Sequence, residues 1–390
     1  MIPLPPWGGR FPRNPIMSLL DEHRRFNLAE STARDLTAGE LIDLIGIEEL
    51  RKIGLGYGSS AGLPPLREIV AEQSGVAPEA VVTTTGVALG LALLAFEACR
   101  PGDQVIVATP CFPPSLDVLA GSGLDVTTLQ LRFDAGYRLD LARLEALVSD
   151  STRLISLASP QNPSGTRLHA DETSALLDII DRRAPNALLF IDETYREATY
   201  GDEAARPSLA PLHPRLITGS SVSKAHGAPG LRVGWLTVPD PELRERLIVA
   251  KMNFVISGSP LSEALAAGLL ARPDAVLRPR HELLSAGLAM TEAWLQNEPR
   301  LEWVRPEAGA LCCIRFRPEV WDEVVAAFWD GLAAHELQLA SGEWFGESRR
   351  VMRLGFGYLP LEGLRRALDA VTRALDLAER AAPEWLSCRG

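Results

Sequence analysis

The sequence predicts an α/β fold, in which helices cover both faces of a mainly parallel sheet and a smaller α+β unit follows. The main observation is that apolar runs alternate with segments of helical periodicity between residues 81 and 238. These runs are continuous rather than alternately polar, which is typical of strands buried on both faces. A length of 390 residues suffices for two domains, and 46% hydrophobic with 23% charged residues is typical of a globular protein.

Seven apolar runs are the predicted strands of the sheet. They comprise residues 81–86, 104–110, 124–131, 153–160, 187–194, 215–220 and 233–238. Helices are predicted between them at 87–98, 115–123, 139–150 and 172–183. The first of these helices is almost wholly apolar, so we expect it to be buried. Ligands of such sheets bind beyond the carboxyl ends of the strands, and functional residues are expected there.

The flanking segments predict an N-terminal arm and a second, smaller domain. We expect residues 1–46 to form the arm and a segment joining the small domain, 47–270 the large domain, and 271–390 the small domain. Amphipathic or apolar segments predict the remaining helices, and two apolar runs predict strands of the small domain. The helices are expected at 36–46, 241–252, 260–271, 273–299, 320–336 and 361–382, and the strands at 310–316 and 351–357.

Composition argues against several classes of function. A net charge of -11, from 39 basic and 50 acidic residues, argues against a nucleic-acid-binding surface. The N-terminus lacks the pattern of a signal peptide and the chain lacks a run of eighteen apolar residues, so we expect a cytoplasmic protein that does not enter the membrane. The five cysteines form no CxxC pair, and the six histidines show no HxxH spacing, which argues against a metal site.

One segment, TGSSVSKAHGAPGLRVGW at 218–235, carries the clearest chemical pattern. Lys224 stands among hydroxyl side chains, and Arg232 follows on the other side of a glycine-containing loop. Cations around small hydroxyl residues form an anion site, and an amine held in such a site can act as a covalent catalyst. The segment resembles the Schiff-base lysine motif of pyridoxal-phosphate (PLP) enzymes of fold type I, the class I and II aminotransferases. This resemblance implies a seven-stranded large domain, a smaller C-terminal domain and PLP as cofactor.

Further motifs follow in the order of that family and extend the resemblance over about residues 50–375. The segments SPQNPSG and IDETY resemble its NPxG turn and D-x-x-Y element. The resemblance implies that Lys224 holds the cofactor as a Schiff base and then acts as general base. It places Asp192 at the pyridine nitrogen and both Asn162 and Tyr195 at the ring oxygen, with Phe112 stacked on the ring.

The phosphate and the substrate are assigned by the same resemblance. In TTGVALG, Gly86 opens a helix whose Val87 and Ala88 amides would hold the phosphate. Ser221, Ser223 and Arg232 would complete this cup, although Ser221 could instead cap the turn. Tyr57 matches a tyrosine that reaches the phosphate of a neighbouring subunit, which implies a homodimer. Arg353 would clamp the substrate carboxylate, with Asn162 beside it.

The N-terminal arm departs from a standard aminotransferase. The segment FNLAESTARDLTAGEL has Glu30, Ser31 and Thr32 where small apolar residues are expected. It resembles the arm of enzymes that act on hydroxylated arginine, including cyclases of the capreomycidine-synthase type. Glu30 would then meet a guanidinium, or the segment is a surface arm with a helix N-cap. The related arginine oxidases differ in the lysine motif, so SVSK argues against oxidation.

Three functions remain open from the sequence. The first is an aminotransferase that moves an amino group from an L-amino acid to a 2-oxo acid. The second is a PLP-dependent elimination or cyclisation enzyme on a basic amino acid with a β or γ substituent. The third is a non-catalytic binding module of the same fold, against which the presence of both Lys224 and Asp192 argues.

Overall fold

The computed structural model of the chain describes residues 9–22 and 24–381. The first eight residues of the predicted arm, residue 23, and residues 382–390 of the predicted small domain lie outside the described residues. Its centre is a seven-stranded sheet, which confirms the predicted fold class. In spatial order the strands are β2 (Val81–Thr84), β8 (Gly234–Thr237), β7 (Leu216–Ser221), β6 (Leu188–Asp192), β5 (Thr152–Ala158), β3 (Gln104–Thr109) and β4 (Asp125–Gln130).

The sheet is parallel except at one strand. Strands β4, β3, β5, β6 and β7 pair in parallel, whereas β8 is antiparallel to both of its neighbours. Successive residues of one strand pack into different apolar clusters. Leu154 and Phe190 belong to one cluster, whereas their strand neighbours Ile155 and Leu189 belong to another. Because side chains alternate between the faces of a strand, a sheet covered on both faces requires these continuous apolar runs.

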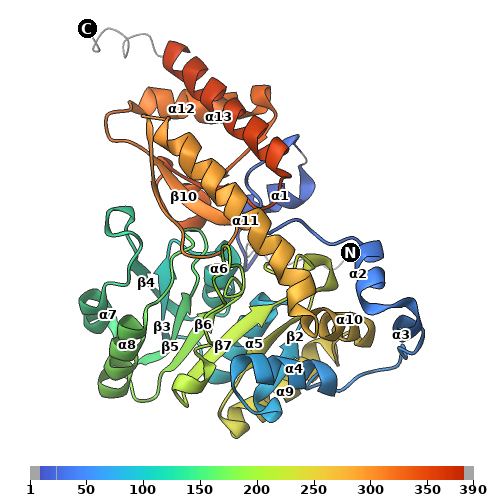
Figure 1. Cartoon of the computed structure of the whole chain (residues 1–390). Coiled ribbons are helices and arrows are strands. Elements are labelled where there is room, and N and C mark those ends of the chain that lie inside the picture. The colour runs from blue at the N-terminus through green and yellow to red at the C-terminus, as the bar shows by residue number, and fades with distance from the viewer. Residues whose placement is uncertain (1–8, 23, 382–390) are drawn as a thin grey trace, which may run out of the picture.

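Helices surround the large sheet. Figure 1 shows the large sheet and its helices in the lower half of the molecule. These helices are α2 (Ala38–Ile45), α3 (Ile47–Arg51), α4 (Pro64–Ser74), α5 (Val87–Ala98), α6 (Pro113–Gly121), α7 (Leu141–Leu147), α8 (Ala170–Arg183), α9 (Pro241–Val255) and α10 (Pro260–Leu270). The predicted helices of this part are thus confirmed, with ends that differ by a few residues.

A second unit lies in the upper half of Figure 1, and the long helix α11 (Pro273–Gln296) runs between the two. Its four-stranded sheet is antiparallel, and the helices α12 (Asp322–Gly331) and α13 (Leu361–Ala381) pack on a common apolar core with it. The strands in order are β12 (Ala340–Ser341), β13 (Val351–Gly355), β10 (Leu311–Phe316) and β9 (Leu301–Val304). The domain boundary at residue 270 stays a prediction.

The N-terminal segment is tied to this second unit. Strand β1 (Phe26–Asn27) pairs in parallel with β11 (Leu337–Gln338), far along the chain. The Leu28 carbonyl then accepts a hydrogen bond from the Gly355 amide over 2.7 Å. These contacts bring residues 28–36 between the second unit and the loops that follow the large sheet. Among the described residues, no helix is long and apolar enough to cross a membrane.

Candidate active site

A cavity of about 760 Å³ opens beyond the carboxyl ends of the parallel strands. The segments that follow β3, β5, β6 and β7 all contribute to its lining, as expected for this type of sheet. Every predicted site residue except Tyr57 lines the cavity. These residues are Glu30, Gly86, Val87, Ala88, Phe112, Asn162, Asp192, Tyr195, Ser221, Ser223, Lys224, Arg232 and Arg353.

Lys224 stands in the turn after β7, half-buried at the cavity wall. Its Nζ donates a hydrogen bond to the Ser31 hydroxyl over 3.0 Å and lies 5.9 Å from the centroid of the Tyr195 ring. The sequence placed Ser31 in an unusual arm but gave it no role. Only the fold brings the arm to the lysine, 193 positions further along the chain.

Asp192 ends β6 and is held by the next turn. Both the Thr194 amide and the Thr194 hydroxyl donate to its Oδ1, so these contacts orient the carboxylate and leave Oδ2 without a hydrogen bond from the described residues. Burial raises the pKa of Asp192, against the opposing effects of the Thr194 hydrogen bonds and the Lys224 charge. A cationic group beside Oδ2 would therefore stabilise the ionised form. Thr194 was not among the site residues predicted from the sequence.

Arg353, on β13, lines the same cavity with 2% of its surface exposed. Its Nη1 donates to Asn162 Oδ1 over 2.9 Å, its Nη2 donates to the Ala29 carbonyl, and its guanidinium lies 4.7 Å from the centroid of Phe345. It forms no ion pair with the described residues, and its Nε is buried without a hydrogen-bond partner. Burial is the main cause that lowers the pKa of Arg353. An anion at this wall would compensate the buried charge.

A different wall of the cavity has the features of an anion site. Helix α5 begins after Gly86 without a side-chain cap, so its first amides, including those of Val87 and Ala88, have no intrahelical acceptor. Gly86 has φ +81°, and a Cβ at this position would lie 2.6 Å from Nη2 of Arg232. Backbone and guanidinium thus approach closely only because residue 86 is glycine.

The two serines near this wall differ in their contacts. The Ser223 amide donates to Ser221 Oγ over 3.3 Å, so the Ser221 hydroxyl caps the turn. No hydrogen bond within the described residues engages the Ser223 hydroxyl. This geometry favours the alternative in which Ser223, rather than Ser221, faces an anion with its hydroxyl.

Two carboxylates of the arm also line the cavity. Glu30 was predicted from the sequence, whereas Asp35 was missed because it has no motif around it. Burial and the negative charge of Glu30 raise the pKa of Asp35, while Lys224 and Arg280 oppose this. The Oδ1 atom of Asp35 is buried without a hydrogen-bond partner in the part of the chain that the structure describes. The arm therefore brings two carboxylates to the cavity, of which Asp35 has one oxygen without a hydrogen bond among the described residues.

Tyr57 is the predicted site residue that the single chain leaves outside. It lies in the loop between α3 and α4 and is 85% exposed. Large apolar side chains are exposed in the same loop and at the end of α9, including Leu55 at 82%, Phe254 at 58% and Ile256 at 49%. The loop is joined to that end of α9 by a hydrogen bond from the Ser60 hydroxyl to the Ile256 carbonyl.

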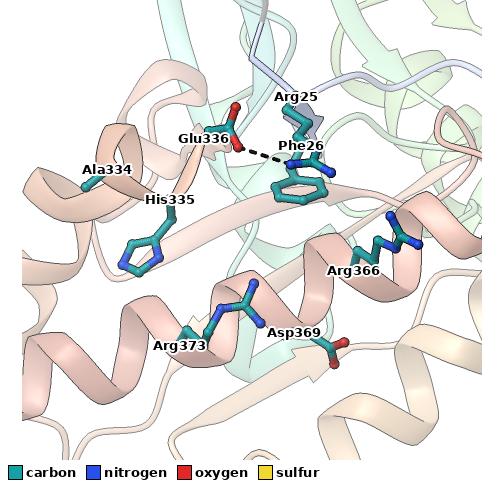
Figure 2. Close-up of a pocket in the computed structure, with 8 residues that line it drawn as sticks. All are labelled: Arg25, Phe26, Ala334, His335, Glu336, Arg366, Asp369 and Arg373. Carbon is teal, nitrogen blue, oxygen red and sulfur yellow. Dashed lines mark hydrogen bonds and ion pairs between the residues drawn. The ribbon is translucent and has the colours of Figure 1, made fainter.

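A smaller hollow of about 370 Å³ lies in the second unit, beside Phe26. Figure 2 shows that Arg25, His335 and Arg373 surround this ring, with Glu336 accepting from Arg25 and Asp369 on the neighbouring helix. The hollow contains none of the predicted site residues. The larger cavity is therefore the candidate active site.

The sequence profile of the family described as aminotransferase class I and II matches residues 37–371. The protein belongs to this family. The class I and II aminotransferases related to it use PLP, and the protein is thus a PLP-dependent transferase.

Two relatives within the family span most of the chain. Capreomycidine synthase from Streptomyces vinaceus is 31% identical, over 90% of this chain and 89% of its own. Arginine–pyruvate transaminase AruH from Pseudomonas aeruginosa is 30% identical, over 80% of each chain.

Solved structures of the family agree with the fold. A PLP-dependent aminotransferase from Streptococcus suis superposes with a TM-score of 0.85 at 25% identity, over 94% of this chain and 98% of its own. The PLP-dependent cyclase OrfR superposes with a TM-score of 0.80 at 25% identity, over 90% and 93%.

The residues of the cavity fit PLP. The Tyr195 hydroxyl is buried and has no hydrogen-bond partner among residues 9–22 and 24–381, which leaves a donor for an acceptor inside the cavity. The glycine turn before α5 accommodates an anion at free amides, and the buried Asp192 carboxylate has an oxygen available for a protonated nitrogen. A phosphate, a phenolic oxygen and a ring nitrogen thus each have a chemically matched group on one cavity wall or another.

Proposed function

We propose that the enzyme moves the amino group of an L-amino acid to a 2-oxo acid, with Lys224 as the base. The observation that carries this proposal is that Lys224 and Arg353 line one cavity, where Arg353 is buried and pairs with no carboxylate of the described residues. A substrate carboxylate would form two hydrogen bonds with the guanidinium. A carboxylate anchored at Arg353 places the substrate in the cavity that Lys224 faces.

PLP, when bound, supplies an electrophilic carbon for the substrate amine and a ring that accepts the electron pair released at the substrate Cα. We assign the phosphate to the Val87 and Ala88 amides, Ser223 and Arg232, with Ser221 capping the turn beside them. Asp192 Oδ2 would keep a proton on the ring nitrogen, and Tyr195 and Asn162 would donate to the ring oxygen. The Phe112 side chain, at the start of α6, would cover one face of the ring.

Lys224 carries the proton in this mechanism. Its Nζ would take the proton from the substrate Cα and deliver it to the electrophilic carbon of the cofactor. Hydrolysis would then release the substrate as a 2-oxo acid and leave its amino group in the enzyme until a second 2-oxo acid arrives. Arg353 would keep the substrate from rotating during this transfer, because two parallel hydrogen bonds define the plane of its carboxylate. Asn162 links the two functions, since its Oδ1 accepts from Arg353 and its amide nitrogen remains available to the cofactor.

The acidic arm favours a substrate with a cationic side chain. Glu30 and Asp35 bring carboxylates to the cavity, and the Asp35 Oδ1 atom has no hydrogen-bond partner among the described residues. A guanidinium would add positive charge beside this pair and a hydrogen-bond donor for Asp35 Oδ1. The name of the relative AruH states arginine as its substrate, which supports the same class here.

A second candidate is elimination or cyclisation on a hydroxylated arginine-like amino acid. It is favoured by the arm residues Glu30, Ser31 and Thr32, which line the cavity in place of small apolar residues. Capreomycidine synthase and the cyclase OrfR are relatives of compatible length. Both candidates use the same lysine and differ only in the fate of the substrate after Cα deprotonation.

We further infer a homodimer in which Tyr57 enters the neighbouring active site. The exposed apolar side chains Leu55, Phe254 and Ile256 surround the loop that carries Tyr57, and burying them would favour association. A hydroxyl at the tip of such a surface can reach a site that its own chain does not approach.

One experiment separates the two reactions. The holoenzyme is incubated with L-arginine, or with a hydroxylated arginine, and no 2-oxo acid. An aminotransferase stops after one equivalent of amino acid per active site and leaves an aminated cofactor. A cyclase turns over repeatedly without an acceptor. Absence of either conversion with any of the twenty amino acids would contradict the proposed transamination.

A further inference from the structure

The N-terminal arm brings the hydroxyl of Ser31 to the amine of Lys224. Ser31 is 4% exposed, and its Oγ accepts the hydrogen bond of Lys224 Nζ at 3.0 Å. This is the only hydrogen bond of the Ser31 hydroxyl among the described residues, so the side chain does not cap a helix or a turn. Its contact with the lysine is therefore its main polar interaction.

The backbone on both sides of Ser31 is held in place. Before it, the Leu28 amide donates to the Gln338 carbonyl over 2.9 Å, and the Leu28 carbonyl accepts from the Gly355 amide. After it, the Leu36 amide donates to the Gly227 carbonyl over 2.7 Å, only three residues beyond Lys224. The arm is thus bound at one end to the second unit and at the other to the lysine loop. These contacts determine where the Ser31 hydroxyl lies.

The Arg34 carbonyl adds a further restraint, because it accepts from Nη2 of Arg280 over 2.8 Å. Arg280 belongs to α11, which runs between the two units. A flexible surface arm would not need anchors on three separate elements. The restraints favour a positioned hydroxyl over one that meets the lysine by chance.

We propose that Ser31 is a positioning residue for Lys224. This inference rests on the proposed role of Lys224 as the base, which needs its lone pair directed at the substrate Cα. An acceptor for one N–H of a flexible amine restricts rotation of that amine. A neutral hydroxyl suits this purpose, because it does not hold the amine as an ion pair as a carboxylate would.

The lysine content of the chain makes a direct test possible. The sequence has only three lysines, at positions 52, 224 and 251. Lys52 is on the surface beside Glu49, whereas Lys251 is fully buried and donates to Thr83. An amine-selective acylating reagent is therefore applied to the apoenzyme, and peptide mass spectrometry measures the labelling rate of each lysine. Lys52 serves as the accessible internal reference and Lys251 as the protected one.

Three variants are compared with the wild type. Ser31→Ala removes the hydroxyl, Ser31→Thr retains it, and Ser74→Ala removes a buried serine hydroxyl on α4, away from the cavity. We expect Ser31→Ala to label Lys224 at least about twofold faster relative to Lys52, since loss of one hydrogen bond frees the amine. Ser31→Thr and Ser74→Ala should label as the wild type does.

A second readout follows the holoenzyme. With L-arginine as probe, Ser31→Ala should slow formation of the aminated cofactor about tenfold and increase the isotope effect of Cα deuteration, because proton transfer becomes slower. The affinities for PLP and for L-arginine should stay unchanged. A purely structural role of Ser31 would instead alter those affinities or the thermal midpoint.

The outcomes separate this inference from the proposed function. If Ser31→Ala labels Lys224 at the wild-type rate, or if folded Ser31→Thr behaves as Ser31→Ala does, the positioning role is wrong. Suppose that Ser31→Ala speeds the labelling of Lys224 as expected, but borohydride fails to join the cofactor to wild-type Lys224. The proposed function is then wrong, whereas the contact between Ser31 and Lys224 is supported. Should Ser31→Thr fail to fold, the labelling rate of Ser31→Ala decides.

Discussion

The guanidinium of Arg353 donates a hydrogen bond to the Asn162 amide oxygen over 2.9 Å, although 191 positions separate the two residues. The contact joins the second unit to the large sheet at the cavity. It also fixes the Asn162 side chain so that its oxygen meets the arginine and its nitrogen remains available. One hydrogen bond thus aligns the proposed carboxylate site with the proposed cofactor site.

Replacing Arg353 with lysine should weaken substrate binding. Lysine retains the charge but cannot form two parallel hydrogen bonds with a carboxylate, so we expect KM for the amino acid to rise about tenfold or more. Initial rates over a range of substrate concentrations measure this. Arg349→Lys, at a position whose Asp330 partner lies 3.7 Å away on the surface, is the matched control. An unchanged KM in Arg353→Lys would contradict the assignment.

Borohydride should attach the cofactor to Lys224 alone. The holoenzyme should lose its yellow colour on reduction, and the tryptic peptide with Lys224 should gain the mass of a pyridoxyl group. Lys52 and Lys251, the other lysines of the chain, serve as internal controls. Lys224→Ala should bind PLP without forming a reducible linkage. A modified Lys52 or Lys251 with an intact Lys224 would refute the role of Lys224.

Asp192→Asn should stabilise the apoenzyme and impair the holoenzyme. Because burial raises the pKa of Asp192 in the folded state, ionisation opposes folding. This cost is absent at a pH below the ordinary carboxyl pKa, develops as pH rises from there toward the folded-state pKa, and persists above it. We expect the variant apoenzyme to melt about 2 °C higher at pH 8, with the difference vanishing near pH 4.

The same variant should bind PLP more weakly and lose most of its activity, since an amide cannot keep a proton on the ring nitrogen. Calorimetric scans of the apoenzyme and titration with PLP measure the two effects. A variant apoenzyme less stable than the wild type at pH 8 would show that the Thr194 contacts need the carboxylate charge.

Glu30→Gln should change substrate preference. Removal of one carboxylate from the cavity should raise KM for L-arginine about tenfold and leave a neutral amino acid such as L-alanine unaffected. Asp35→Asn should act in the same direction. The selectivity ratio measured with both amino acids is the test, and Glu48→Gln on exposed α3 is the control. Equal losses for both amino acids would argue against recognition of a cationic side chain.

Mixing two inactive variants should restore activity if Tyr57 completes the neighbouring site. Tyr57→Ala and Lys224→Ala homodimers should each have little activity. After exchange of subunits, half of the dimers are mixed, and each has one site with both residues intact, so about a quarter of wild-type activity is expected. Absence of recovery in a verified heterodimer would place Tyr57 outside the partner's site.

Much of the fold followed from local pattern. Continuous apolar strands and intervening helices predicted the parallel sheet, because a strand buried on both faces leaves no polar alternation. The lysine segment, the NPxG turn and Asp192 were found because their chemistry depends on neighbours in sequence. Thr194 and Ser221 contact groups only two positions away in the sequence. Their hydrogen bonds, however, are known only from the structure.

Long-range relations were decided by the tertiary structure alone. The antiparallel direction of β8, the pairing of β1 with β11 and the approach of Ser31 to Lys224 depend on chain segments that no local pattern connects. Asp35 could not be predicted as a site residue, since an isolated carboxylate in a sequence is usually solvated. Only the structure shows that its Oδ1 atom is buried without a hydrogen bond among the described residues. The sequence by itself determined the family and the sheet, and it predicted the reactive lysine. The tertiary structure decided which side chains surround that lysine, because packing sets their distances and solvation.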